Sequence, residues 1–104
     1  MDMVKSVLHE ELDHSLKTRE HYLSVISELP RGILSKKKIN GREYNYLLYR
    51  EGSKVKTSYL GKLSENEIQD LIQKIDRRKY YKKMLKEVQQ KVNYLNKVLN
   101  VKTT

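Results

Sequence analysis

Residues 31–62 constrain the fold most strongly, because this stretch interrupts two long helical patterns. Before and after it, apolar residues recur every three or four positions, as they do on one face of an α-helix. Within it, apolar and polar side chains alternate with a period of two, which is typical of half-buried strands. The sequence therefore predicts an α+β fold with a long N-terminal helix, a three-stranded antiparallel β-meander and a long, coiled-coil-like C-terminal helix.

The first helix is expected over residues 3–28. One stripe of apolar side chains follows helical spacing and consists of Val4, Leu8, Leu12, Leu16, Leu23 and Ile26. Pro30 disfavours helical backbone at the residue before it, so we expect the helix to end there. His14 and His21 lie on this segment, but no carboxylate or cysteine stands at metal-ligand spacing with both, and no metal site is expected.

The sheet is expected over residues 32–60, and its strands over 33–39, 42–50 and 54–60. Asn40-Gly41 is the strongest hairpin signal, because a type I′ turn needs positive φ at both central residues. The two-residue turn also fixes the register. Ile39 is then paired with Arg42, and Lys37 with Tyr44.

This register divides the side chains between two faces of the sheet. One face is apolar enough to pack on a helix and collects Ile33, Ile39, Tyr44, Tyr46, Leu48, Val55, Thr57 and Tyr59. The other is rich in lysine and collects Leu34, Lys36, Lys38, Asn45, Leu47, Tyr49, Lys54, Lys56 and Ser58. We therefore expect the apolar face to point inward and the lysine-rich face to point outward.

The second helix is expected over residues 64–99. Ser64 and Glu67 form a capping-box pattern, and Leu63 and Ile68 occupy the hydrophobic-staple positions. An apolar rhythm of three and four continues through Ile68, Leu71, Ile72, Ile75, Leu85, Val88, Val92, Leu95 and Leu99. Such a helix is roughly 50 Å long and extends beyond the first helix. A homodimer through residues 64–99 is one way to cover its far end.

Composition restricts the classes of protein to which the chain can belong. Its 104 residues are expected to form a single domain, residues 1–104. It has no cysteine, and no apolar run approaches the roughly 18 residues that span a membrane. No catalytic triad, phosphate-binding glycine loop or carboxylate pair is visible. We expect a cytoplasmic, non-enzymatic protein without catalytic residues, cofactor or small-molecule substrate.

Positive charge and tyrosine are concentrated in the middle of the chain. Residues 31–62 carry nine Lys/Arg, two Glu and four of the eight tyrosines, which is +7 of the net charge of +9. On nucleic acid, lysines of such a sheet contact phosphates, and amide, hydroxyl or phenol groups contact base edges. A second basic stretch, residues 77–83, surrounds two tyrosines. The candidate contact residues are Lys36, Lys38, Asn45, Tyr49, Lys54, Lys56, Ser58, Arg77, Arg78 and Lys82.

Nucleic-acid binding, with DNA favoured over RNA, is the leading hypothesis, and other interpretations stay open. The lysines can instead keep an exposed sheet face soluble and protect its edges from aggregation. The helices can also form a protein-interaction or assembly module, in which case the basic sheet meets an acidic protein. In residues 77–83, Tyr80 or Tyr81 can fill the helical seam while the cations extend to solvent.

A run of motifs resembles a family of short, uncharacterised bacterial and archaeal proteins. It consists of Leu29-Pro30-Arg31-Gly32-Ile33, Lys38-Ile39-Asn40-Gly41-Arg42-Glu43-Tyr44, Tyr46-Leu47, Tyr49-Arg50-Glu51-Gly52, Lys54-Val55 and Tyr59-Leu60-Gly61. The resemblance covers about a third of the chain and implies no assigned activity.

Two looser resemblances point toward DNA. The last part of the run, through Leu63, is similar to a segment of some transposases. Three strands followed by a helix are similar to the arm-site DNA-binding domain of tyrosine recombinases, whose sheet lies in the major groove. The long helix before the sheet and the much longer helix after it depart from that domain. The small size and the transposase likeness fit a regulator from a phage or other mobile element.

Overall fold

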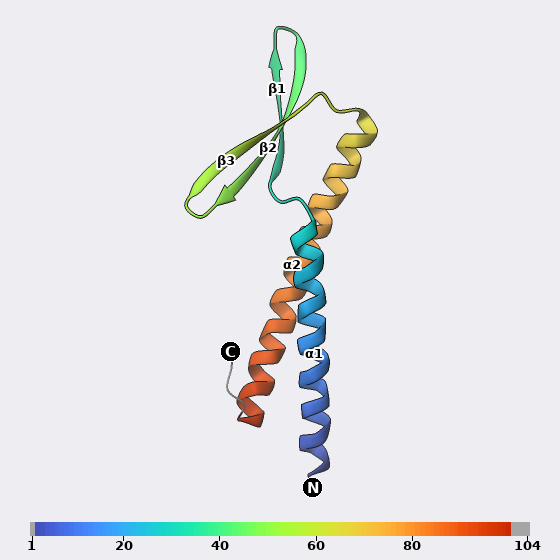
Figure 1. The fold of residues 1–104 in the computed structure, drawn as a ribbon, viewed down its shortest axis with the longest axis vertical. Helices are drawn as coiled ribbons and strands as arrows, with labels where there is room; N and C mark the ends of the chain where they lie inside the picture. Colours follow the sequence, from blue (N-terminus) through green and yellow to red (C-terminus); the bar gives the residue numbers. More distant parts are fainter. Residues whose placement is uncertain (1, 101–104) are drawn as a thin grey trace. The chain divides into compact units, whose positions relative to one another are not determined.

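The computed structural model describes residues 2–100 and contains two helices and one sheet (Figure 1). The elements in chain order are α1 (Met3–Glu28), β1 (Ile33–Ile39), β2 (Arg42–Glu51), β3 (Lys54–Gly61) and α2 (Glu65–Leu99). The predicted α+β fold is confirmed, and β2 and β3 each extend one residue beyond their predicted ends. No helix within residues 2–100 combines the length and apolar character needed to cross a membrane.

Capping residues set where the helices begin. The Ser64 hydroxyl accepts a hydrogen bond from the Glu67 amide, and the Glu67 carboxylate accepts one from the Ser64 amide, each at 3.1 Å. This is the predicted capping box, and it makes Glu65 the first helical residue of α2. At α1, the Asp2 carboxylate accepts a hydrogen bond from the Val4 amide at 3.0 Å, a cap that sequence periodicity did not single out.

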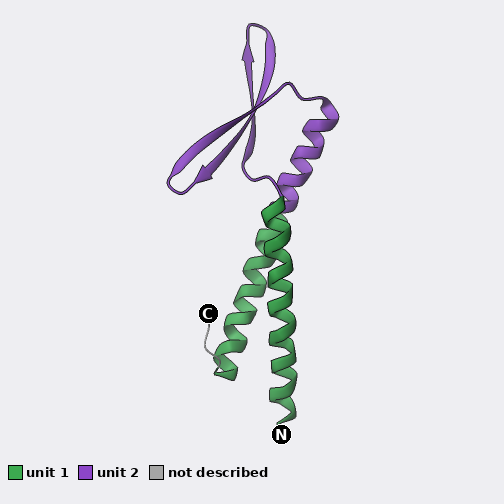
Figure 2. Ribbon diagram, in the orientation of Figure 1, with its two compact units in different colours: residues 1–28, 79–104 green, residues 29–78 purple. Residues whose placement is uncertain are grey.

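The chain divides into two compact units, which Figure 2 colours separately. Unit 1 comprises residues 1–28 and 79–104, and unit 2 comprises residues 29–78. Unit 1 contains α1 and the C-terminal part of α2, whereas unit 2 contains the sheet and the N-terminal part of α2.

Unit 1 is an antiparallel pair of helices with a narrow apolar seam. Leu12, Val92 and Leu95 form its buried core, and Leu8, Leu16 and Leu99 pack around them. The middle of each predicted stripe therefore lies in the seam, whereas Val4 and Leu23 are exposed. Across the helices, Arg19 donates a hydrogen bond to Gln89 at 3.2 Å, and Lys91 pairs with Glu11.

Aromatic side chains fill the seam where the apolar stripe of α2 is interrupted. The ring of Tyr81 lies edge-on to that of Tyr22 at 5.6 Å and to that of His21 at 6.4 Å. Tyr81 is half-buried, while its neighbour Tyr80 is exposed. Tyr81 thus serves as a seam residue, as the packing interpretation of residues 77–83 proposed.

Unit 2 contains an antiparallel sheet in the order β1-β2-β3. Asn40 and Gly41 have φ of 53° and 80°, as a type I′ turn requires, and the predicted pairs Ile39–Arg42 and Lys37–Tyr44 are both present. The β2–β3 register shifts between Asn45 and Tyr46, an irregularity that the alternating pattern did not indicate.

Gly32 allows the backbone before β1 to approach β2 closely. Its φ is 115°, and a Cβ at this position would lie 2.2 Å from the carbonyl oxygen of Leu48. A side chain is therefore excluded both by backbone conformation and by the approach of β2.

Candidate nucleic-acid interface

The sheet register places the four predicted lysines on one face. Cross-strand partners share a face, so the pairings assign the following residues to what we call the lysine face: Leu34, Lys36, Lys38, Glu43, Asn45, Leu47, Tyr49, Glu51, Lys54, Lys56 and Ser58. All four lysines are exposed. Their ammonium groups are thus available to an anionic partner.

Two glutamates on the same face partly offset the lysines. Glu43 lies opposite Lys38, and Glu51 lies opposite Lys54 while pairing with Lys56 at 2.8 Å. Both members of the Lys56–Glu51 pair are about half exposed, and such surface pairs contribute little free energy. Phosphate groups can therefore compete for these lysines.

The lysines form two pairs at opposite ends of the face. Lys36 and Lys38 adjoin the Asn40-Gly41 turn, whereas Lys54 and Lys56 adjoin the Gly52 turn. Lys36 and Lys56 face positions four residues apart along β2, roughly 13 Å at the rise of a strand. The two pairs are therefore suited to separate phosphates rather than to one.

Asn45 does not present its amide to a ligand. Its side chain is 3% exposed, and Nδ2 donates a hydrogen bond to the Gly61 carbonyl at 3.1 Å. Gly61 is its partner across the sheet, next to the register shift. The expectation that Asn45 contacts base edges is therefore corrected: its amide is engaged in holding β2 to β3. Ser58, which is half-buried opposite Leu47, is also only partly accessible.

Arg31 lies over Tyr49 at one end of the lysine face, and its charge acts on Arg78. The Arg31 guanidinium carbon lies 5.3 Å from the centre of the Tyr49 ring. Partial burial, and then the positive charge of Arg31, lower the pKa of the Arg78 guanidinium. We call Arg31, Tyr49 and Arg78 the guanidinium corner.

The guanidinium corner has no carboxylate of its own. Within residues 2–100, neither Arg31 nor Arg78 takes part in an ion pair. Lys56 lies directly across the sheet from Tyr49 and adds a third cation to this end of the face. Sequence patterns identified Tyr49 and Arg78 but missed Arg31, because it precedes β1 and the alternation that defines the faces.

The basic stretch 77–83 is divided between the two units. Arg77 and Arg78 belong to unit 2, and Lys82 belongs to unit 1. Arg77 and Lys82 are exposed. Lys82 lines an open groove of about 670 Å³ in unit 1, together with Arg19, Glu20, Leu23, Leu85, Lys86, Gln89 and Gln90.

The opposite face of the sheet is largely exposed rather than directed inward. By the same register it carries Ile33, Ser35, Lys37, Ile39, Arg42, Tyr44, Tyr46, Leu48, Arg50, Val55, Thr57 and Tyr59, and we call it the tyrosine face. Ile33, Val55 and Tyr59 are 67%, 64% and 61% exposed. The expectation that this face points inward is wrong, because alternation shows which residues share a face and not which face is covered.

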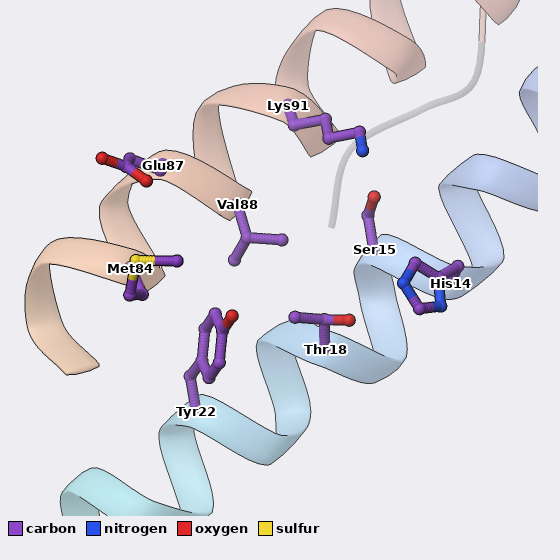
Figure 3. Close-up of a pocket in the computed structure, with 8 residues that line it drawn as sticks. All are labelled: His14, Ser15, Thr18, Tyr22, Met84, Glu87, Val88 and Lys91. Carbon is purple, nitrogen blue, oxygen red and sulfur yellow. The ribbon is translucent and has the colours of Figure 1, made fainter.

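A small cavity of about 230 Å³ lies between the helices of unit 1 (Figure 3). Ser15 is buried there, and its hydroxyl has no hydrogen-bond partner among residues 2–100. His14 also lines the cavity, yet no hydrogen bond joins it to Ser15, so the two do not form a nucleophile and base. Among the described residues no group of three metal-ligating side chains comes together.

A protein-family model matches the chain over α1, the sheet and the start of α2. The model described as "Domain of unknown function (DUF6788)" covers residues 4–70. Neither the curated proteins nor the solved structures give a significant match. Because the matched region is more than half of the 104 residues, the chain belongs to the DUF6788 family, a domain family of unknown function.

Proposed function

We propose that this protein is a non-enzymatic nucleic-acid-binding protein that contacts phosphates through the lysine face and the guanidinium corner. The observation that carries the proposal is the placement of four exposed lysines on one face of the sheet, with Arg31 over Tyr49 at its end and no ion pair to Arg31 or Arg78 among the described residues. Two neighbouring guanidiniums repel one another, and an anion between them relieves that repulsion. Phosphate suits this role because guanidinium groups bind its oxygens in a bidentate manner.

Duplex DNA is the proposed form of nucleic acid for this face. A β-ribbon fits the major groove of B-DNA, and lysine pairs at both ends of such a ribbon can reach phosphates on either side of the groove. The resemblance of the strands and following helix to the arm-site domain of tyrosine recombinases, and of one segment to transposases, supports the same choice. We further propose that the protein is a cytoplasmic regulator of phage or mobile-element origin.

A gel-shift titration with matched variants tests this function. Replacing Lys36, Lys38, Lys54 and Lys56 by Gln removes four charges from the lysine face. A control replaces Lys5, Lys17, Lys86 and Lys97, all exposed residues of unit 1, and removes the same charge. We expect the first variant to lose most of its affinity for a duplex and the control to keep most of it. Equal losses in the two variants contradict a site on this face.

An assembly role is the second candidate, because the unit 1 groove leaves apolar surface uncovered. Leu23 is 47% exposed at this groove and shares it with Leu85. The homodimer expected through residues 64–99 cannot use the whole apolar stripe of α2 as its interface, because Val92 and Leu95 are buried against α1. A partner would instead use Leu23 and Leu85. Sedimentation of wild type and Leu23→Glu tests this role: a complex that the substitution dissolves supports it, and a monomer in both forms contradicts a homodimer.

A further inference from the structure

The tyrosine face carries a second surface for nucleic acid, with chemistry different from that of the lysine face. We propose that it binds an unpaired strand of DNA or RNA, whose bases stack on Tyr44, Tyr46 and Tyr59. This inference rests on the proposed nucleic-acid function and deepens it by assigning single strands to a named set of side chains.

The three tyrosine rings form one cluster across two strands. Tyr46 and Tyr59 are cross-strand partners whose ring centres lie 5.3 Å apart, and Tyr44 lies 6.3 Å from Tyr59. Tyr59 is largely exposed, while Tyr44 and Tyr46 are half-buried and so held in place. An accessible ring beside supported rings is the arrangement that base stacking requires, because the stacking surface loses little freedom on binding.

The charges on this face match a phosphate backbone. Its cations are Lys37, Arg42 and Arg50, and its residues include no Asp or Glu. The Lys37 ammonium lies over the Tyr46 ring, 5.1 Å from its centre, so one cation is held at the tyrosine cluster itself. The lysine face differs in both respects, since it holds Glu43 and Glu51 and only one tyrosine.

A single strand fits these features better than a duplex does. Bases in a duplex are stacked on each other, and their faces are closed to side chains, whereas an unpaired strand offers both bases and phosphates. A cluster in which the Tyr59 ring lies 5.3 and 6.3 Å from the other two ring centres accommodates two or three bases. An acidic protein would satisfy the cations but has no need of the exposed rings, so we favour the strand.

Fluorescence anisotropy with labelled dT12 and rU12 tests the inference. The test variant is Tyr59→Leu, which removes an exposed ring and keeps apolar bulk. Tyr59→Phe keeps the ring, and Tyr94→Leu removes an exposed tyrosine from unit 1 as a control. We expect Tyr59→Leu to weaken single-strand binding about tenfold, while Tyr59→Phe and Tyr94→Leu bind as the wild type does. Whichever of dT12 and rU12 binds more tightly identifies whether the strand is DNA or RNA.

Duplex binding, measured on the same proteins, separates this inference from the proposed function. If the wild type binds duplex DNA but neither oligonucleotide, the single-strand site is overturned and the proposed function stands. If single-strand binding is unchanged in Tyr59→Leu and is lost in the lysine-face variant, the strand lies on the other face and the inference is also overturned. A wild type that binds none of the three at low salt overturns both. A change of sedimentation in Tyr59→Leu without loss of single-strand binding assigns the face to a protein partner instead.

Discussion

The side-chain amide of Asn45 donates a hydrogen bond to the Gly61 carbonyl across a shift in the β2–β3 register. Its Nδ2 is satisfied at 3.1 Å, while its buried Oδ1 has no partner among the described residues. The interaction joins the end of β3 to the middle of β2, so Asn45 contributes to the stability of the sheet on which the lysines are displayed.

We predict that Asn45→Asp destabilises the protein more than Asn45→Ala does. Alanine loses the hydrogen bond to the Gly61 carbonyl, which costs about 1 kcal/mol. Aspartate is close in shape but directs a buried carboxylate toward that carbonyl, which costs more because no donor compensates its charge. Urea unfolding followed by circular dichroism at pH 7 measures the unfolding free energy of both variants. Equal stability of the two variants would show that this side chain is not confined as described.

We predict that Gly32→Ala costs well over 1 kcal/mol of unfolding free energy. A methyl group at this position meets the Leu48 carbonyl and also requires a φ of 115°, which side chains rarely adopt. Gly52→Ala is the matched control, because φ is also positive there, at 63°, but the space is open. Thermal unfolding of the two variants should rank Gly32→Ala as clearly less stable. A reversed ranking contradicts the close approach of β2.

We predict that Val92→Ala destabilises unit 1 by about 2 kcal/mol. Val92 is fully buried and forms the core of the helical seam with Leu12 and Leu95, and the shortened side chain leaves a cavity. Val98→Ala makes the same change at an exposed position of α2, so any gain in helix propensity is common to both. The midpoints of urea unfolding compare the stabilities of the two variants. A similar effect at both positions would contradict the assigned seam.

We predict that stability falls on acidification partly through Glu11. The hydrogen bond from Lys91 lowers the pKa of the Glu11 carboxyl below its ordinary value. A carboxyl whose pKa is lowered by folding stabilises the folded state above its ordinary pKa, and this contribution is lost as pH falls through the lowered value. Unfolding at pH 7 and pH 3 should therefore show a smaller difference for Glu11→Gln than for the wild type. An identical pH dependence contradicts the link between Lys91 and Glu11.

The sequence predicted the elements well because each boundary has a local cause. Asn40-Gly41 can adopt positive φ, Ser64 and Glu67 cap α2 reciprocally, and Pro30 follows the end of α1. These interactions involve residues close in sequence, so their patterns are visible without knowledge of the fold. The register followed from the two-residue turn for the same reason.

Features that depend on distant residues were not predictable in this way. The coverage of a sheet face depends on what packs there, and an alternating pattern cannot distinguish an exposed row of Ile33, Val55 and Tyr59 from a buried one. The register shift turned Asn45 into a buried partner of Gly61. Arg31 and Arg78 are 47 positions apart, and only the fold of unit 2 allows the charge of Arg31 to act on Arg78.

The salt dependence of duplex binding tests the proposed nucleic-acid function most directly. Anisotropy of a labelled duplex, titrated between 50 and 200 mM salt, gives a slope of log affinity against log salt of about 0.9 per phosphate contact. We predict that the affinity of the wild type falls steeply as salt rises. The slope should be reduced by about 2 in Arg31→Gln/Arg78→Gln. In Lys5→Gln/Lys17→Gln the slope should show no reduction beyond a small general effect of the lost charge. No binding at 50 mM salt, or the same slope in all three proteins, would contradict phosphate contact at the guanidinium corner.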